Sequence, residues 1–166
     1  MILERSEVQA CRAEWRTEGK RVVFTNGCFD LIHLGHVRYL EEARALGDVL
    51  VLGLNSDSSV RQLKGPQRPL VSQDERAIVM SALRPVDHVV IFDELTAEAL
   101  IAELQPDVYV KGGDYSIANS PQPEGKPLPE ADIVHSYGGE VALIPFLPGH
   151  STSDLIKKIV ALYSQQ

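Results

Sequence analysis

The sequence predicts an α/β protein: a Rossmann-like, doubly wound, five-stranded parallel sheet with helices on both faces. Short runs that are apolar throughout recur along the chain, as is typical of parallel strands buried on both faces. Segments with apolar residues at helical spacing separate these runs, which is the alternation of βα units. The 166 residues, 44% hydrophobic and 23% charged, suffice for one domain with a substantial core.

Each element follows from a local pattern. The apolar runs predict strands at residues 22–25, 49–54, 88–92, 108–111 and 141–146. Apolar spacing and end signals predict helices at 36–46, 72–83, 96–104 and from residue 151 or 152 to 163. Ser72 to Glu75 has the S-x-x-E form of a capping box, and Thr96 is expected to cap the next helix.

Two segments stand apart from this pattern. Residues 1–20 are expected to form a helical N-terminal extension, ahead of a main domain at 21–166. Residues 116–131 hold four of the ten prolines. This segment is either a solvated loop or a lid beside the site.

Composition excludes several classes of function. The net charge of −7 argues against a nucleic-acid binder, because phosphate backbones favour basic surfaces. No run approaches the ~20 apolar residues of a membrane span, and the N-terminus lacks a signal-peptide core. Two cysteines, Cys11 and Cys28, cannot form a disulfide framework or a zinc knuckle. We therefore expect a cytoplasmic protein without membrane partners.

Polar residues follow four of the five predicted strands. In open parallel sheets ligands bind beyond the carboxyl ends of the strands, where strand order reverses. The polar segments are NGCFDLIHLGH (26–36), NSD (55–57), KGGD (111–114) and PGHSTSD (148–154). Lys111 ends an apolar strand, where a lysine is costly without an anionic partner. Stability alone does not explain this clustering.

The first segment fits phosphate chemistry. Gly27 allows a close turn, and Gly35 lets a ligand approach the start of a helix, where the dipole favours anions. His33 and His36 lie three residues apart and project in similar directions. The pair lacks the further ligands that Zn²⁺ needs. Two interpretations remain: ordinary packing, or imidazoles that contact phosphates during a reaction.

Two further features carry alternatives. Cys28 near a helix start could be a nucleophile, although no base adjoins it, or a small residue beside a phosphate loop. Ser151, Thr152 and Ser153 could cap a helix or donate to phosphate, and the two roles are compatible.

These motifs together resemble those of the cytidylyltransferase-like nucleotidyltransferases. The family's HxGH signature matches His33-Leu34-Gly35-His36, and its Ser/Thr-rich start to a late helix matches Ser151 to Ser153. From Arg21 onward the chain looks like the branch that acts on D-glycero-β-D-manno-heptose 1-phosphate. Phe146 and Leu147 replace an Arg-Thr pair of the cytidylyl branch, which disfavours CTP.

The resemblance implies a fold, a reaction and a set of roles. Residues 21–166 would be the nucleotidyltransferase domain, transferring AMP from ATP, with Mg²⁺, to the sugar phosphate. The catalytic residues would be His33, His36 and Lys64. The nucleotide would be bound by Asn26, Gly27, Cys28, Phe29, Gly35, His36, Lys111, Gly112, Gly113, Asp114, Ser151, Thr152 and Ser153. The acceptor would be bound by Asp30, Asn55, Asp57 and Arg76, although Arg76 is equally well read as a surface arginine.

No residue is assigned as a metal ligand, since Mg²⁺ often keeps its waters. The expected partners are a sugar phosphate, a second copy in a homodimer and a separate sugar kinase of the same pathway. Competing readings are a cytidylyltransferase for glycerol 3-phosphate, an adenylyltransferase of the pantetheine-phosphate or nicotinate-nucleotide type, and an ATP-binding module without turnover. A Rossmann oxidoreductase is disfavoured because no G-x-G-x-x-G follows the first strand.

Overall fold

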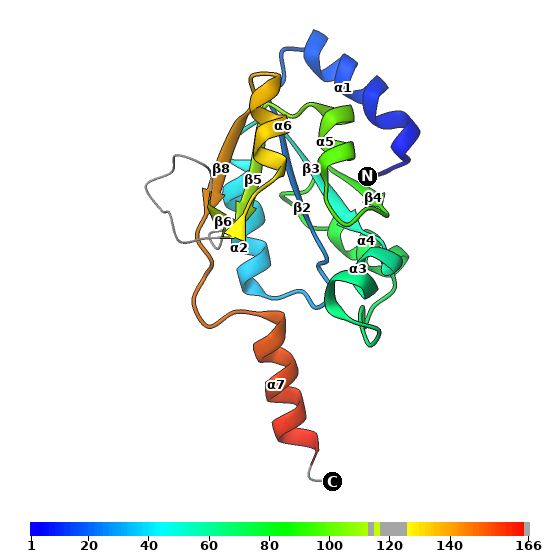
Figure 1. Cartoon of the computed structure of the whole chain (residues 1–166), viewed down its shortest axis with the longest axis vertical. Helices are drawn as coiled ribbons and strands as arrows, with labels where there is room; N and C mark the ends of the chain where they lie inside the picture. The colour runs from blue at the N-terminus through cyan, green and yellow to red at the C-terminus, as the bar shows by residue number, and fades with distance from the viewer. Residues whose placement is uncertain (113–114, 117–125, 165–166) are drawn as a thin grey trace.

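A six-stranded parallel sheet forms the centre of the protein (Figure 1). The computed structural model describes residues 1–112, 115–116 and 126–164. The strands lie in the order β1-β4-β3-β2-β5-β8. Their bounds are Ile2–Leu3 (β1), Val22–Gly27 (β2), Val49–Asn55 (β3), His88–Phe92 (β4), Val108–Gly112 (β5) and Glu140–Ile144 (β8). Strand order reverses at β2, which pairs with β3 on one side and β5 on the other.

The sheet has one strand more than the five expected, and the five expected strands are all present. The added strand is β1, where Ile2 and Leu3 pair with Val89 and Val90 of β4. A two-residue strand has no periodicity from which a sequence could reveal it. The helix expected in the first 20 residues is α1 (Val8–Thr17), reached through a 3-10 turn, η1 (Arg5–Glu7). Val8 and Trp15 of α1 are buried in the core.

Helices cover both faces of the sheet because its strands are apolar on both faces. Val22 and Phe24 of β2 pack in the layer that holds α1, α5 (Glu98–Leu104) and α6 (Glu130–Ser136). Val23, between them, packs in the other layer, with α2 (Leu34–Arg44) and α4 (Gln73–Ser81). This two-residue alternation creates two cores, one on each face, and leaves the edge at the carboxyl ends of the strands open to a ligand.

Most predicted helix signals are present, and one is wrong. The Ser72 hydroxyl accepts from the Glu75 N–H at 3.4 Å, while the Glu75 carboxylate accepts from the Ser72 N–H at 3.3 Å. Helix α5 begins one residue later than expected, with Ala97 and not Thr96 at its N-cap. The Thr96 hydroxyl instead donates to the Glu98 carboxylate at 2.7 Å.

Several short elements lie where the sequence indicated loops. Helix α3 (Asp57–Lys64) follows β3 directly. Strands β6 (Tyr115–Ser116) and β7 (Lys126–Pro127) pair in parallel, and α6 starts inside the proline-rich segment. Residues 117–125 of that segment lie outside the described residues, so the choice between loop and lid stays a prediction.

The last helix, α7 (Thr152–Tyr163), projects away from the body of the molecule (Figure 1). Ser151 is its N-cap, as predicted, but none of its residues is buried. In the part of the chain that the structure describes, no helix is long and apolar enough to cross a membrane.

Candidate active site

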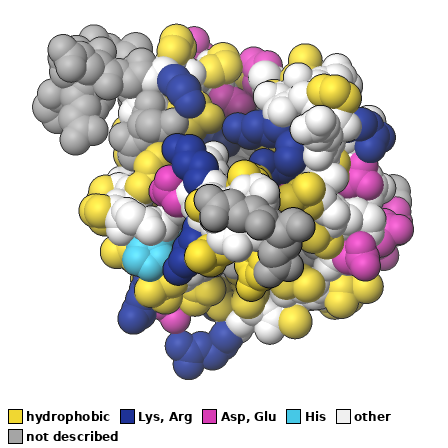
Figure 2. Space-filling view, turned by 90° about the horizontal axis from the view of Figure 1, so that it is seen from below, with side chains coloured by type: hydrophobic (Ala, Val, Ile, Leu, Met, Phe, Trp, Pro, Cys, Tyr) yellow, Lys and Arg dark blue, Asp and Glu magenta, His cyan; other side chains and the backbone are white. Residues whose placement is uncertain are grey.

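A cavity of about 820 Å³ opens at the carboxyl ends of the strands, between the β2 loop and the start of α7. Figure 2 views this end of the molecule and shows Lys and Arg side chains gathered around a hollow. A smaller cavity of about 430 Å³ lies at the opposite end, beside Arg21, Asp107 and Glu140, which precede or begin β2, β5 and β8. It is lined by none of the predicted site residues, so the larger cavity is the candidate site.

Most of the predicted residues meet in the larger cavity. It is lined by Asn26, Gly27, Cys28, Phe29, Asp30, His33, Gly35, His36, Asn55, Lys64, Lys111, Gly112, Ser151, Thr152 and Ser153. Asp57 and Arg76 do not line it. Gly113 and Asp114 lie outside the described residues.

His33 and His36 form a stacked pair at the start of α2. Their ring centroids are 3.8 Å apart, with an interplanar angle of 25°, and Phe29 tilts against His36 at 5.2 Å. Glycine at position 35 allows this packing, because a Cβ there would lie 3.0 Å from His33 Nδ1 and 3.2 Å from the Cβ of His150. The Nδ1 atoms of both rings are buried without a hydrogen-bond partner. Because both residues also line the cavity, the pair presents two imidazole rings to a ligand bound there.

Both imidazoles are neutral at pH 7 in the unliganded chain. Burial, reinforced by the neighbouring His33, lowers the pKa of His36 to about 4. Burial and His150 also lower the pKa of His33. An anion bound against the rings would favour their charged forms and raise both pKa values.

The β2 loop curls back under the cavity. Phe29 takes a left-handed conformation with φ of 45°, and its ring lies so close that a Cβ on Gly27 would meet Phe29 Cε2 at 2.9 Å. Asn26 Oδ1 accepts from the Tyr109 hydroxyl at 2.9 Å. A non-glycine residue at positive φ is uncommon and here turns the loop back at the end of the strand.

The start of α7 is anchored to this loop. The Thr152 hydroxyl donates to the Leu31 carbonyl at 3.3 Å, and the Ser151 hydroxyl accepts from the Asp154 N–H at 3.0 Å. Ser151 is thus a helix cap, which is one of the two roles that the sequence predicted for the hydroxyl run. Ser153 is exposed and lines the cavity. The Thr152 contact brings the start of α7 beside the loop between β2 and α2, 121 residues away in sequence.

Four cationic side chains line the cavity. Lys64 ends α3 and is exposed, and Lys111 ends β5 and is buried. Lys111 Nζ lies 5.2 Å from the centroid of the Tyr115 ring and donates to the Asn26 carbonyl at 3.4 Å. Arg68 and Lys126 complete the set. Cations from four different segments give this edge of an acidic protein a local affinity for phosphate.

Asp30 lines the cavity, but protein groups hold its carboxylate. Its side chain is 1% exposed and pairs with Arg68 at 2.5 Å, while the N–H groups of Leu70 and Val71 donate to it at 2.8 and 3.0 Å. Burial opposes ionisation, yet these two N–H groups and the Arg68 guanidinium keep the pKa of Asp30 below its usual value. Its observed partners are the residues that fix the 68–71 loop.

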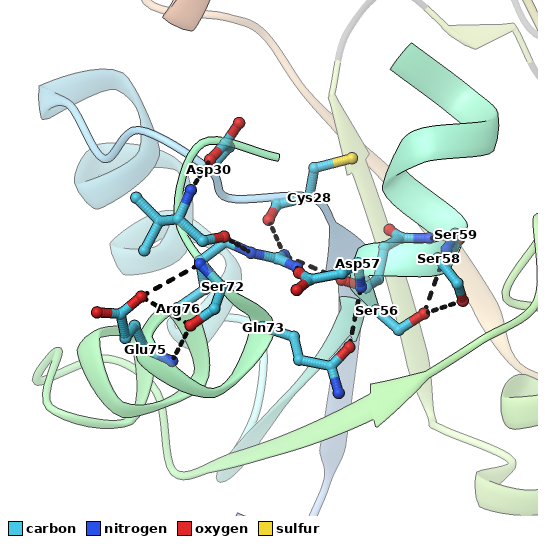
Figure 3. A network of polar contacts seen from close by, with 12 residues as sticks. Cys28, Asp30, Ser56, Asp57, Ser58, Ser59, Ser72, Gln73, Glu75 and Arg76 are labelled. Atoms are coloured by element: carbon cyan, nitrogen blue, oxygen red, sulfur yellow. Dashed lines mark hydrogen bonds and ion pairs between the residues drawn. The ribbon is translucent and has the colours of Figure 1, made fainter. Parts of the chain in front are cut away.

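Arg76 is the centre of a buried network under the site (Figure 3). Its guanidinium donates to the carbonyls of Cys28, Asn55 and Val71 and pairs with Asp57 at 2.8 Å. The side chain is 1% exposed, so the reading as a surface arginine is wrong. Neither Arg76 nor Asp57 lines the cavity, and their contacts hold the β2 loop and the end of β3 together.

Cys28 has no feature of a nucleophile. Burial raises the pKa of its thiol despite the nearby cations Lys64 and Arg76. A thiol that stays protonated at neutral pH is a poor nucleophile. Its backbone carbonyl accepts a hydrogen bond from Arg76, which helps to hold the β2 loop in place.

The lining residues that the sequence left unassigned include Arg68, Lys126, Glu130 and His150. Arg68 stands in the R-P dipeptide after Lys64, but no spacing rule tied it to Asp30. Glu130 lies in the proline-rich segment that was read as loop. His150 could have been noticed, because it directly precedes the hydroxyl run.

The described residues offer no preformed metal site. Among them, no group of three or more His, Cys, Asp or Glu side chains could hold a metal ion. Any divalent cation at this site would therefore have to arrive with phosphate oxygens as its main ligands.

Comparison with known proteins agrees with this geometry. The model of the Cytidylyltransferase-like family matches residues 24–158, from β2 to the middle of α7. The chain belongs to the cytidylyltransferase-like family. The resemblance inferred from the HLGH and STS motifs is thereby confirmed.

Relatives cover the chain almost completely. It is 51% identical over 165 residues to the bifunctional protein HldE of Trichlorobacter lovleyi, covering 99% of this chain and 32% of that protein. It is 52% identical over 158 residues to HldE of Wolinella succinogenes, covering 95% and 31%. The chain thus spans about a third of the length of these relatives.

A solved structure has the same fold. The lipopolysaccharide core biosynthesis protein from Thermoplasma volcanium GSS1 aligns with a TM-score of 0.60 and 27% sequence identity. The alignment covers 78% of this chain and 98% of that one. The predicted Rossmann-like α/β class is confirmed.

Proposed function

We propose that this chain is an adenylyltransferase that transfers AMP from ATP to D-glycero-β-D-manno-heptose 1-phosphate, giving ADP-heptose and pyrophosphate. The observation that carries the proposal is the stacked His33–His36 pair, facing a cavity with four cations beside the start of α7. The similarity of the chain to HldE proteins and to a lipopolysaccharide core biosynthesis protein supports a sugar phosphate as the acceptor.

The reaction needs no covalent enzyme intermediate. A phosphate oxygen of the acceptor attacks the α-phosphorus of ATP in line, the new P–O bond forms, and the bond to the leaving pyrophosphate breaks. Among the described residues, Cys28 is the thiol that lines the site, and burial raises its pKa, which keeps it protonated. Catalysis is then positioning and stabilisation of phosphate charge.

His33 and His36 would stabilise that charge. Both rings line the cavity and their pKa values are low without ligand, so a bound phosphate would supply the negative field that favours their charged forms. Lys64, exposed at the end of α3, would reach the phosphates as a mobile cation. Ser151, Thr152 and Ser153 would hold the leaving pyrophosphate at the start of α7.

The nucleotide would lie along the carboxyl ends of β2 and β5. Asn26, Gly27, Cys28 and Phe29 would contact it through the backbone of the β2 loop, with Gly35 leaving room at the α2 start. Lys111 and Gly112 line the cavity opposite, and Gly113 and Asp114 are proposed to continue this surface. Asn55 is proposed for the acceptor, whereas Asp30, Asp57 and Arg76 act by positioning loops.

Mg²⁺ is proposed to enter with ATP. It would neutralise phosphate charge while keeping several waters, which suits a site without a cluster of protein ligands among its described residues. A cytoplasmic location is proposed because ATP is a substrate. A sugar kinase that makes the acceptor is the proposed pathway partner.

A homodimer is proposed through α7. Its exposed apolar residues are Ile159, Val160, Leu162 and Tyr163, the last 66% exposed. An apolar row on a projecting helix is typical of a protein interface. Sedimentation of the wild type and of Leu162→Asp tests this: a dimer that the variant converts to monomer is expected, and a monomeric wild type contradicts it.

The function is tested by pyrophosphate release with Mg²⁺, crossing ATP and CTP with heptose 1-phosphate and glycerol 3-phosphate. Release with ATP and the heptose alone is expected. Release with CTP and glycerol 3-phosphate would move the chain to the cytidylyl branch. ATP binding without any release would make it a binding module. His36→Ala, with the exposed His135→Ala as control, should lower turnover at least ~10²-fold.

A further inference from the structure

Glu130 is a buried carboxylate in the cavity that the phosphate chemistry leaves unused. It is 6% exposed and is the first residue of α6, on the face of the sheet opposite to His33 and His36. Every other buried or half-buried charge described at the site is a cation or, like Asp30, is held by one. Phosphate binding therefore does not explain why a carboxylate is buried at this position.

Among the described residues, Glu130 has few hydrogen-bond partners. Glu130 Oε1 accepts from the Ala97 N–H at 3.5 Å, the outer limit of a hydrogen bond. The ion pairs of the described residues join other carboxylates, such as Glu94, Asp30 and Asp57, and none of them includes Glu130. A buried carboxylate normally accepts two or more strong bonds, so this one has unused acceptor capacity.

Glu130 lies beside the loop that follows β4. Ala97 N ties it to the loop after β4, where Thr96 and Leu95 also line the cavity. Burial and then the Glu130 charge raise the pKa of Tyr109, whose hydroxyl donates to Asn26 in the cavity wall, so Glu130 lies near this part of the wall. A negative group there repels phosphate oxygens and attracts donors, and hydroxyl groups are the donors that a sugar offers.

The phosphate-binding groups and Glu130 therefore divide the cavity. The His33–His36 pair and Ser151 to Ser153 lie at the α2 and α7 starts, which leaves the side of α5 and α6 for a group rich in hydroxyls. We propose that Glu130 binds hydroxyl groups of the sugar acceptor and so selects a polyhydroxylated phosphate ester. This inference rests on the proposed sugar-phosphate transfer and names a residue that binds the sugar.

The test is steady-state kinetics of Glu130→Gln with ATP and heptose 1-phosphate. A charge-assisted hydrogen bond is about twice as strong as a neutral one, so KM for the heptose phosphate should rise about tenfold, with KM for ATP within about twofold. Glu98→Gln is the matched control: Glu98 lies two residues from Thr96 on α5, carries the same charge and does not line the cavity.

A structural role makes the opposite prediction. If Glu130 only caps α5 through Ala97, the variant loses thermal stability while both KM values stay unchanged, and the proposal is overturned. If KM rises for ATP alone, the hydroxyls belong to the ribose and the acceptor assignment is wrong. The Kd for ATP by calorimetry, unchanged in the variant, confirms that it is folded.

The same experiment separates this inference from the proposed function. If the wild type releases no pyrophosphate with ATP and heptose 1-phosphate, the sugar-phosphate transfer itself is wrong. If the wild type turns over normally and Glu130→Gln matches it in both KM values, the transfer stands and only the role of Glu130 is overturned.

Discussion

The imidazole rings of His33 and His36 stack with centroids 3.8 Å apart at the entrance of α2. Two unprotonated rings can lie this close, whereas two protonated rings would repel each other. The contact therefore ties the geometry of the site to its protonation state. Four predictions follow from this pair and from the residues that hold the loops around it.

Gly35→Ala should impair turnover without harming the fold. The added Cβ would lie 3.0 Å from His33 Nδ1, so the ring must shift by a few tenths of an ångström. A misplacement of about 1 Å at a reacting centre costs on the order of 10²-fold in rate, so the loss here should be smaller than that. Alanine is the better helix former by about 1 kcal/mol. We expect kcat to fall and the thermal midpoint to hold or rise. Leu34→Ala, an exposed neighbour that does not line the cavity, is the control.

His36 should make the folded state less stable in acid. Burial lowers its pKa to about 4, from 6.5 in the unfolded chain. Between these values the unfolded state binds more protons, so the free energy of unfolding should fall as the pH drops from about 6.5 to about 4. Urea titrations at several pH values should show a shallower fall for His36→Asn than for the wild type. Identical slopes would contradict the neutral, buried state of His36, and exposed His135→Asn serves as control.

Asp30→Asn should destabilise the protein and the site together. The carboxylate, 1% exposed, holds Arg68 and the N–H groups of Leu70 and Val71. Removing one charge of a buried pair costs about 3 kcal/mol, and the freed loop would displace the Arg68 side chain that lines the cavity. Chemical denaturation and turnover measure the two effects. Asp74→Asn, on the exposed first turn of α4, should change neither.

Arg76→Lys should show that this residue positions the site. A lysine keeps the charge but cannot replace a guanidinium that bonds three carbonyls and Asp57. The unsatisfied carbonyls of Cys28 and Asn55 should cost about 2 kcal/mol or more and loosen two walls of the cavity. We expect a lower thermal midpoint and lower kcat/KM for both substrates. Arg84→Lys, whose side chain is 92% exposed, is the matched control.

The sequence predicted the elements whose signals are local. Five apolar runs gave five strands, Ser72 to Glu75 gave a capping box, and Ser151 gave the cap of α7. Strand β1 and helix α6 carried no comparable signal, because two residues have no period and the proline-rich segment hid the helix start. Thr96 is not the cap of α5, since Ala97 occupies the N-cap and the Thr96 hydroxyl donates to Glu98.

The sequence by itself determined the family and predicted most residues of the candidate site that line the cavity, since HLGH and STS follow strand ends that a parallel sheet brings to one edge. Only the tertiary structure decided what each charged side chain does there. Asp30, Arg76 and Glu130 look alike in sequence, as polar residues near strand or helix ends. Asp30 pairs with a residue 38 positions away, and Arg76 donates to a carbonyl 48 positions away. Among the described residues, Glu130 accepts only one weak hydrogen bond, from Ala97. Burial and partners fix the role of a charge, and both depend on segments that meet only in the folded chain.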